Sequence, residues 1–139
     1  MKDAYLILAH GNFEMLRLLL SCLDDERNEI FVHVDKKVKE LPELHVDRSI
    51  MHLLSSRVDV RWGAFSMIEA EYALFEAASA SGPYRYYHLL SGVDLPIKSQ
   101  DYIHEYLDRH NGEEFIGYTW TLMPPGFRRK VQCRHLFSE

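Results

Sequence analysis

Residues 4–34 read AYLILAHGNFEMLRLLLSCLDDERNEIFVHV, with two short apolar runs on either side of a segment of helical periodicity. The run 4–9 is continuously apolar, and 30–34 is apolar except for His33, as expected of strands that are buried on both faces. Between them, leucines recur at helical spacing over residues 13–22, and Asn12 can cap that helix. Strand, helix and strand within about 30 residues predict a βαβ unit of a parallel sheet.

The rest of the chain continues this alternation. We predict further strands at 58–62, 86–90 and 114–117, helices at 66–80 and 99–109, and a short helix at 50–54. The pattern predicts an α/β fold with a Rossmann-like, mostly parallel sheet flanked by helices. Because the chain reaches Glu139 without a cap or turn signal, we expect the fold to be incomplete at its C-terminus.

Two of the predicted helices carry a start signal. Ser66 and Glu69 have the spacing of a capping box, and Ser99 can cap the later helix. The period of the first of these helices is expected to turn four side chains toward the sheet, namely Ile68, Tyr72, Phe75 and Ala78.

Composition narrows the class of protein. The chain has 139 residues, 47% of them hydrophobic, and a net charge of −5, which argues against a general nucleic-acid binder. No apolar run approaches the roughly 18 residues of a membrane span. The two cysteines, Cys22 and Cys133, lie far apart, and Cys22 falls in an apolar run, so we expect a buried free thiol. We therefore predict a soluble, cytoplasmic chain, with peripheral association with a membrane left open.

Polar or aromatic residues follow four of the predicted strands. They are His10, Asp35 with its neighbours Lys36 and Lys37, Trp62, and Asp94. Ligands of open parallel sheets bind at the carboxyl ends of the strands, so these side chains are expected to converge. An acid there can accept hydrogen bonds from a ribose or a uracil N–H, and an indole can stack on a flat ring. Gly11 and Gly92 can admit a ligand or a second backbone segment.

Each of these residues also has a structural interpretation. His10 can be a polar strand terminus, Asp35 can cap the turn that follows it, and Trp62 can belong to the core. A basic run such as 128–130 usually forms a solvated surface, although it can also bind a phosphate. The occurrence of such residues at four strand ends favours the interpretation as a site.

Several chemistries lack their sequence motifs. The eight histidines include no His-Glu-x-x-His spacing, and the chain has no Cys-x-x-Cys pair, so we expect no metal site. The chain also lacks a glycine-rich phosphate loop and a Gly-x-Ser-x-Gly elbow. Dehydrogenase, P-loop and hydrolase functions therefore lose their main support.

Three segments, in this order, resemble the core-2/I-branching β-1,6-N-acetylglucosaminyltransferases, a family that includes the peptide O-xylosyltransferases. The first runs from Ala4 through the sequence His33-Val34-Asp35-Lys36-Lys37. The second is Val60-Arg61-Trp62-Gly63-Ala64-Phe65-Ser66. The third and most specific is Ser91-Gly92-Val93-Asp94-Leu95-Pro96-Ile97-Lys98. The resemblance covers residues 4–116.

The resemblance implies a GT-A-type fold, a UDP-sugar donor and inverting transfer to a hydroxyl of a glycan or glycoconjugate, such as a cell-surface polysaccharide. The family's donor-nucleotide contacts fall on Leu8, Ala9, His10, Asp35, Lys36, Lys37 and Trp62. Asp94 stands where other GT-A enzymes carry a metal-binding Asp-x-Asp. This family lacks that motif, and the resemblance implies catalysis without a metal cofactor. The donor sugar stays open between N-acetylglucosamine, xylose and others.

The resemblance also divides the chain into a nucleotide-sugar-binding domain over residues 1–117 and the start of an acceptor-side region over 118–139. The family's catalytic base is a glutamate of its C-terminal half, expected beyond Glu139, so the sequence assigns no base here. Two alternatives remain open: a nucleotide-binding fragment without turnover, and a flavodoxin-like binding domain.

Overall fold

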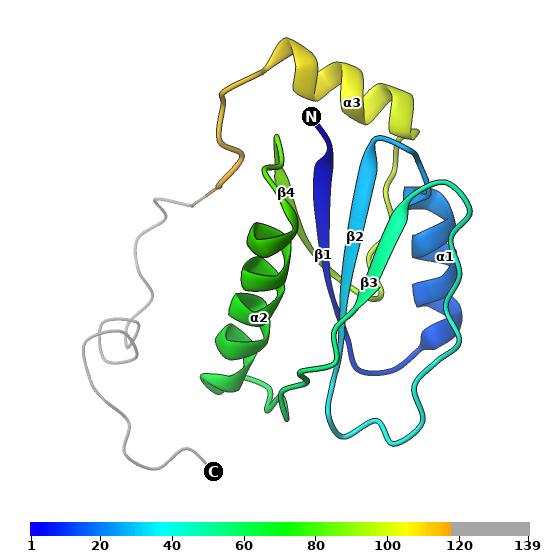
Figure 1. The fold of residues 1–139 in the computed structure, drawn as a ribbon, viewed down its shortest axis with the longest axis vertical. Helices are drawn as coiled ribbons and strands as arrows, with labels where there is room; N and C mark the ends of the chain where they lie inside the picture. The colour runs from blue at the N-terminus through cyan, green and yellow to red at the C-terminus, as the bar shows by residue number, and fades with distance from the viewer. Residues whose placement is uncertain (118–139) are drawn as a thin grey trace, which may run out of the picture.

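The structure, a computed structural model, describes residues 1–117, and its elements alternate between strand and helix (Figure 1). In chain order they are β1 (Asp3–Ala9), α1 (Phe13–Leu23), β2 (Asn28–Val34), β3 (Ile50–Leu53), α2 (Ser66–Ser81), β4 (Tyr87–Ser91) and α3 (Gln100–Arg109). The predicted α/β class is confirmed. No helix among residues 1–117 is long and apolar enough to cross a membrane.

The four strands form a parallel sheet in the order β3-β2-β1-β4. The chain first moves from β1 outward to β2 and β3, and then returns to the other side of β1 as β4. The direction of winding therefore switches beside the carboxyl end of β1, which is where open α/β sheets bind ligands. α3 lies across the opposite, amino-terminal ends of the strands (Figure 1).

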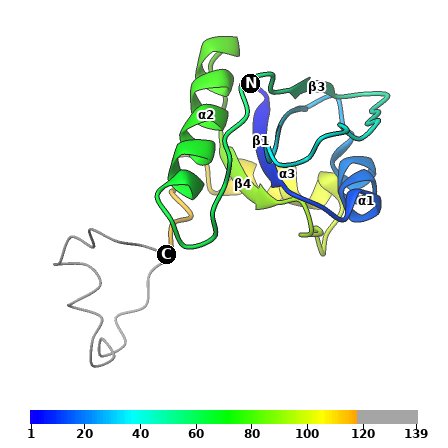
Figure 2. The same cartoon turned by 90° about the horizontal axis from the view of Figure 1, so that it is seen from below.

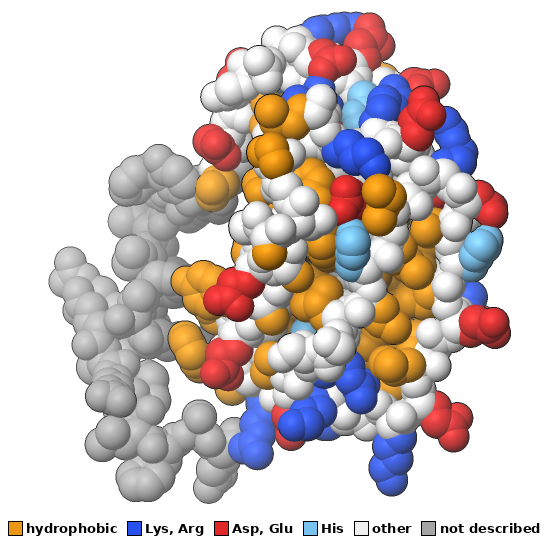
Figure 3. Space-filling model, viewed as in Figure 1, with side chains coloured by type: hydrophobic (Ala, Val, Ile, Leu, Met, Phe, Trp, Pro, Cys, Tyr) orange, Lys and Arg blue, Asp and Glu red, His pale blue; other side chains and the backbone are white. Residues whose placement is uncertain are grey.

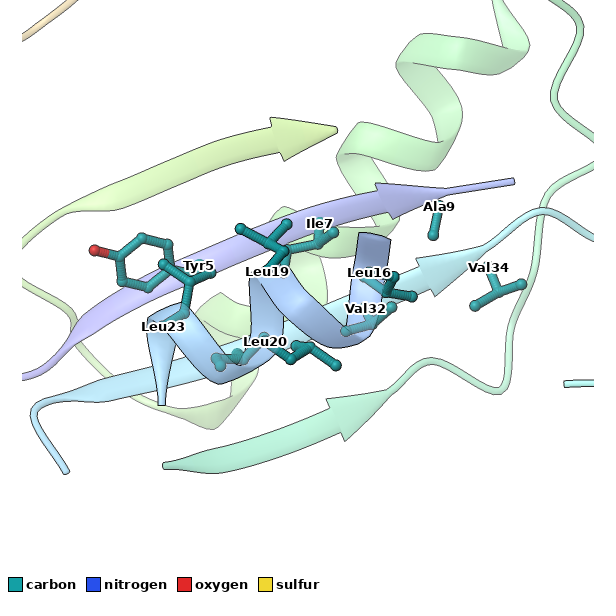
Figure 4. Close-up of a cluster of buried hydrophobic side chains, with 10 residues drawn as sticks. Tyr5, Ile7, Ala9, Leu16, Leu19, Leu20, Leu23, Val32 and Val34 are labelled. Carbon is teal, nitrogen blue, oxygen red and sulfur yellow. The ribbon is translucent and has the colours of Figure 1, made fainter. Parts of the chain in front are cut away.

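The two long helices cover opposite faces of the sheet, on either side of β1 (Figure 2). Tyr5, Ile7 and Ala9 of β1 face α1, where they pack against its buried leucines and against Val32 and Val34 of β2 (Figure 4). The alternate residues Ala4 and Leu6 face α2 and pack against Leu74 and Ala78. Because both faces of β1 and β2 are buried, apolar residues point to both faces instead of alternating with exposed polar ones, and the polar residues of these strands are buried as well.

The helix starts agree with the prediction at Asn12 and Ser99 and disagree at Ser66. Asn12 and Ser99 accept hydrogen bonds from the amides of Met15 and Tyr102, so both act as caps. Ser66 is instead the first residue of α2, and its hydroxyl accepts from the Arg61 amide at 2.8 Å. The capping-box prediction is therefore wrong, because this hydroxyl serves the preceding loop.

The sheet-facing side of α2 was predicted only in part. Its buried residues are Ala70, Leu74 and Ala78, whereas Ile68 and Tyr72 are exposed. Small residues at 70 and 78 let the helix lie close to the sheet, so the apolar stripe runs along alanines rather than the larger side chains. Cys22 is likewise exposed, contrary to the expected buried thiol.

Three short elements differ from the prediction. Residues 50–53 form strand β3 rather than a helix, because they pair with Glu29–Val32 along the free edge of β2. Residues 58–62 and 114–117 have no regular secondary structure. Periodicity cannot separate a short helix from a short strand in runs of four or five residues, so a partner strand decides.

Gly92 brings the end of β4 against the end of β1. Its amide donates to the Leu8 carbonyl at 2.7 Å, and a Cβ built at this position would lie 3.1 Å from the Ala9 Cβ. We expect Gly92→Ala to lower the free energy of unfolding by about 1–3 kcal/mol, because the two strand ends must separate. Chemical denaturation measures this loss. Gly11→Ala is the matched control, since nothing lies within 4 Å of a Cβ there; equal losses in the two variants would contradict the prediction.

Candidate functional site

A cleft of about 800 Å³ opens at the carboxyl ends of the strands. Its walls come from the ends of β1, β2 and β4, from the loop before α2, and from the first turns of α2. This volume is within the range of small-molecule sites in proteins, about 300–1,000 Å³. Figure 3 shows Lys and Arg side chains along this lower edge of the molecule, and the exposed basic residues of this end include Lys36, Lys37 and Arg61.

Most of the predicted site residues line this cleft, namely Leu8, Ala9, His10, Asp35, Lys37 and Trp62. The structure thus brings three of the four predicted strand-end groups together. Lys36 and Asp94 do not line the cleft. The Asp94 carboxylate accepts a hydrogen bond from the Ser91 amide at 2.8 Å and closes the turn after β4. At the end of this strand it is Ser91, not Asp94, that lines the cleft.

Asp35 is a buried carboxylate whose oxygens already have protein partners. Only 3% of the residue is exposed; Oδ1 accepts from the Lys37 amide at 2.9 Å, and Oδ2 lies 3.1 Å from the Lys37 Nζ. Burial by itself would raise the pKa of Asp35, but the hydrogen bonds and charge of Lys37 outweigh it, so the pKa lies below its usual value. Asp35 therefore caps the turn after β2 as well as lining the cleft.

The loop 57–62, of which residues 58–62 were predicted as a strand, is held by individual hydrogen bonds instead of the hydrogen-bond ladder of a sheet. The Val58 amide donates to His33 Nε2 at 2.9 Å, and the Val58 carbonyl accepts from the Lys36 amide at 3.0 Å. Lys37 Nζ contacts Asp59 at 3.2 Å and also the Val60 carbonyl. Residues of and just after β2 thus fix this loop beside the cleft.

Trp62 stands at the rim of the cleft with 93% of its surface exposed. The alternative that it belongs to the core is therefore wrong. The turn around it depends on Gly63, which has a φ of 74°, and on the Ser66 hydroxyl, which binds the Arg61 amide. An exposed indole on a turn fixed at both sides is available to stack on a flat ligand.

Sequence reasoning missed further residues of the cleft, among them His33, Arg61, Met67, Glu71 and Ser91. Signals for some of them exist in the sequence. His33 lies two residues before Asp35 on one strand and so shares its face, and Met67 and Glu71 are one helical turn apart. Glu71 adds a second carboxylate to the lining, from α2.

Residues 1–117 hold no cluster of three or more His, Cys, Asp or Glu side chains suited to a metal ion. The Asp35 carboxylate in the cleft is engaged by Lys37, and the carboxylate of Asp94, which does not line the cleft, accepts from the Ser91 amide. The arrangement offers an aromatic platform, basic groups and hydrogen-bonding groups, which suits an anionic ligand with a flat ring.

An open parallel sheet with a cleft at its switch point is the arrangement in which α/β domains bind ligands. Residues 4–135 match the core-2/I-branching enzyme family, and the chain belongs to that family. It is 29% identical over 146 residues to the N-acetyllactosaminide beta-1,6-N-acetylglucosaminyl-transferase of Mus musculus, in an alignment covering 98% of this chain and 36% of that protein. The chain thus spans about a third of the length of this curated relative.

Proposed function

We propose that this chain forms the donor-nucleotide part of a glycosyltransferase that transfers a sugar from a UDP-sugar to a hydroxyl of a glycan or glycoconjugate. The observation that carries the proposal is the cleft at the switch point, which the exposed Trp62 lines together with the ends of β1 and β2. The name of the mouse relative favours N-acetylglucosamine as the donor sugar over xylose.

In the proposed reaction a carboxylate takes the proton of the acceptor hydroxyl, which attacks the anomeric carbon as UDP leaves with inversion. Residues of this chain bind and orient the nucleotide: Trp62 stacks on the uracil, and the strand ends hold the ribose. Arg61, exposed at the cleft, balances negative charge on the diphosphate. We assign no base among residues 1–117.

We propose further that no metal cofactor takes part. Two features of the described carboxylates support this. Asp35 is engaged by Lys37, and Asp94, the candidate for a metal-binding position, lies outside the cleft lining with its carboxylate on the Ser91 amide. The direct test is to measure sugar transfer by the longer protein in the presence of a chelator. A loss of transfer activity that Mn²⁺ restores would contradict the proposal that no metal takes part.

Trp62→Ala is expected to weaken UDP binding by about 1–3 kcal/mol, the usual contribution of one aromatic side chain stacked on a base. Isothermal titration calorimetry measures the change. Phe65→Ala is a matched control, because Phe65 is an exposed aromatic residue nearby in the same segment that does not line the cleft. Equal UDP affinity in Trp62→Ala and the parent would contradict the proposed platform.

Two other functions remain as alternatives. A nucleotide-binding module without turnover would bind UDP but give no sugar transfer when the longer protein is assayed with a radiolabelled UDP-sugar. A flavodoxin-like binding domain would show no UDP-specific shifts in an NMR titration. The clustering of His10, Asp35 and Trp62 at one cleft favours the nucleotide-sugar site over that second alternative.

A further inference from the structure

We propose that His33 is a positioning residue of the donor site: through the Val58 amide it holds the loop that carries Trp62. This inference rests on the proposed function, in which Trp62 contacts the nucleotide. It assigns a role to a buried histidine that does not itself need to touch the ligand.

The first support is the geometry of the contact. His33 belongs to the fully buried strand β2, and only 1% of the residue is exposed. Its Nε2 accepts a hydrogen bond from the Val58 amide at 2.9 Å. An imidazole nitrogen that accepts carries no proton, so the ring is neutral and its proton is on Nδ1. Burial lowers the pKa of His33, against the opposing effect of the Asp35 charge, which keeps this form dominant at neutral pH.

The second support is the comparison with the other contacts of the loop. Lys37 also reaches the loop, but its side chain is largely exposed, and so is its partner Asp59. Exposed ion pairs contribute little, because water and salt compete for both groups. The His33–Val58 bond starts from a rigid, buried strand, so its loss leaves a partly buried amide without a partner. The loop has no strand ladder to replace it.

The third support is the short distance along the chain. Val58 lies four residues before Trp62, and the Ser66 hydroxyl holds Arg61 on the other side of the turn. The indole is thus carried by a short segment that is held at Val58, by His33 and by the Lys36 amide, and at Arg61, by Ser66. Loss of the His33 contact leaves Val58 held only through its carbonyl, by the Lys36 amide, which loosens the segment and lets Trp62 move at the cleft.

The test compares His33→Leu, which removes the acceptor, with His33→Gln, whose side-chain carbonyl can accept from Val58. In a Trp120→Phe background, the fluorescence anisotropy of Trp62 reports the loop, and calorimetry reports UDP affinity. We expect His33→Leu to lower the anisotropy and weaken UDP binding about five- to tenfold, and His33→Gln to restore most of both. Unchanged anisotropy and affinity in a folded His33→Leu variant would overturn the proposal.

The two proposals can fail separately. If the parent chain does not bind UDP, the proposed function fails, yet the anisotropy and the exchange rate of the Val58 amide still report whether His33 holds the loop. If His33→Leu does not fold, titration of the parent replaces it. The charged groups that act on His33 are Asp35 and Arg57, and Glu71 and Lys37 line the same cleft.

In that titration, protonation of His33 turns its Nε2 from an acceptor into a donor that faces the Val58 amide. We expect the protection of the Val58 amide, taken relative to its intrinsic exchange rate at each pH, and the Trp62 anisotropy both to fall as the pH falls below 6.5, the ordinary histidine value, in the parent but not in His33→Gln. The same pH profile in parent and His33→Gln would overturn the proposal, because the glutamine does not titrate.

Discussion

Arg85→Met is expected to lower the free energy of unfolding by about 3–5 kcal/mol, because it leaves the buried Asp3 carboxylate without its main partner. Asp3 is fully buried at the start of β1, and Arg85 meets it with two hydrogen bonds, of 3.0 Å from Nε and 2.7 Å from Nη2. Arg85 also pairs with Asp108 of α3. The variant therefore also weakens the packing of α3 on the amino-terminal ends of the strands.

Chemical denaturation measures this loss. Arg109→Met is the matched control, since Arg109 is an exposed arginine of α3 in an i,i+4 pair with Glu105, and such a pair contributes about 0.3–0.5 kcal/mol. The double variant Asp3→Leu with Arg85→Met should recover part of the loss, because it removes the unpaired charge. A loss below about 1 kcal/mol in Arg85→Met would contradict this account of Asp3. UDP affinity should stay unchanged in the folded fraction, because the cleft lies at the other end of the sheet.

Asp35→Ala is expected to weaken UDP binding by about 1–3 kcal/mol, whether Asp35 accepts a hydrogen bond from the nucleotide or only holds the turn after β2. The substitution removes the acceptor of the Lys37 amide and the partner of the Lys37 ammonium. Asp59→Ala is the matched control, because Asp59 also contacts Lys37 but is exposed and does not line the cleft. Equal UDP affinity in Asp35→Ala and the parent, measured by calorimetry, would exclude both roles.

Acid unfolding gives a second measurement on the same residue. The pKa of Asp35 lies below its usual value of 3.8, so the carboxylate stabilises the fold above that pH, and this contribution is lost as the pH falls through the lower folded value. Asp35→Asn has no such carboxylate. Its free energy of unfolding should therefore fall less than that of the parent over this acidic range.

The first half of the fold could be predicted from the sequence because its signals are local and strong. The strands β1 and β2 are buried on both faces, and the leucines of α1 repeat at helical spacing. Each of these elements can therefore be predicted from its own residues. The caps at Asn12 and Ser99 act on amides three residues away, which is also a local effect. Asp35 could be placed at the cleft because carboxyl ends of parallel strands share one edge. Trp62 was placed there on a strand that does not form, and it reaches the cleft from a loop instead.

The rest depended on contacts between distant residues. β3 is a strand because the edge of β2 was free, and the loop 57–62 stays outside the sheet, where His33 and Lys37 bind its backbone at Val58 and Val60. Asp94 was predicted at the site by its place after β4, yet its carboxylate closes a turn with Ser91. None of these features can be predicted from the periodicity of the sequence, because each depends on individual hydrogen bonds or on a partner strand.

The amino-acid order alone determined the parallel α/β class, the βαβ start and the resemblance to the core-2/I-branching family, because these depend on apolar period and on short motifs. The tertiary structure alone decided three features. Trp62 is exposed, the buried face of α2 carries Ala70 and Ala78, and Asp3 forms a buried pair with Arg85. The physical reason is that burial and pairing belong to residues brought together across the chain, 82 positions apart for Asp3 and Arg85.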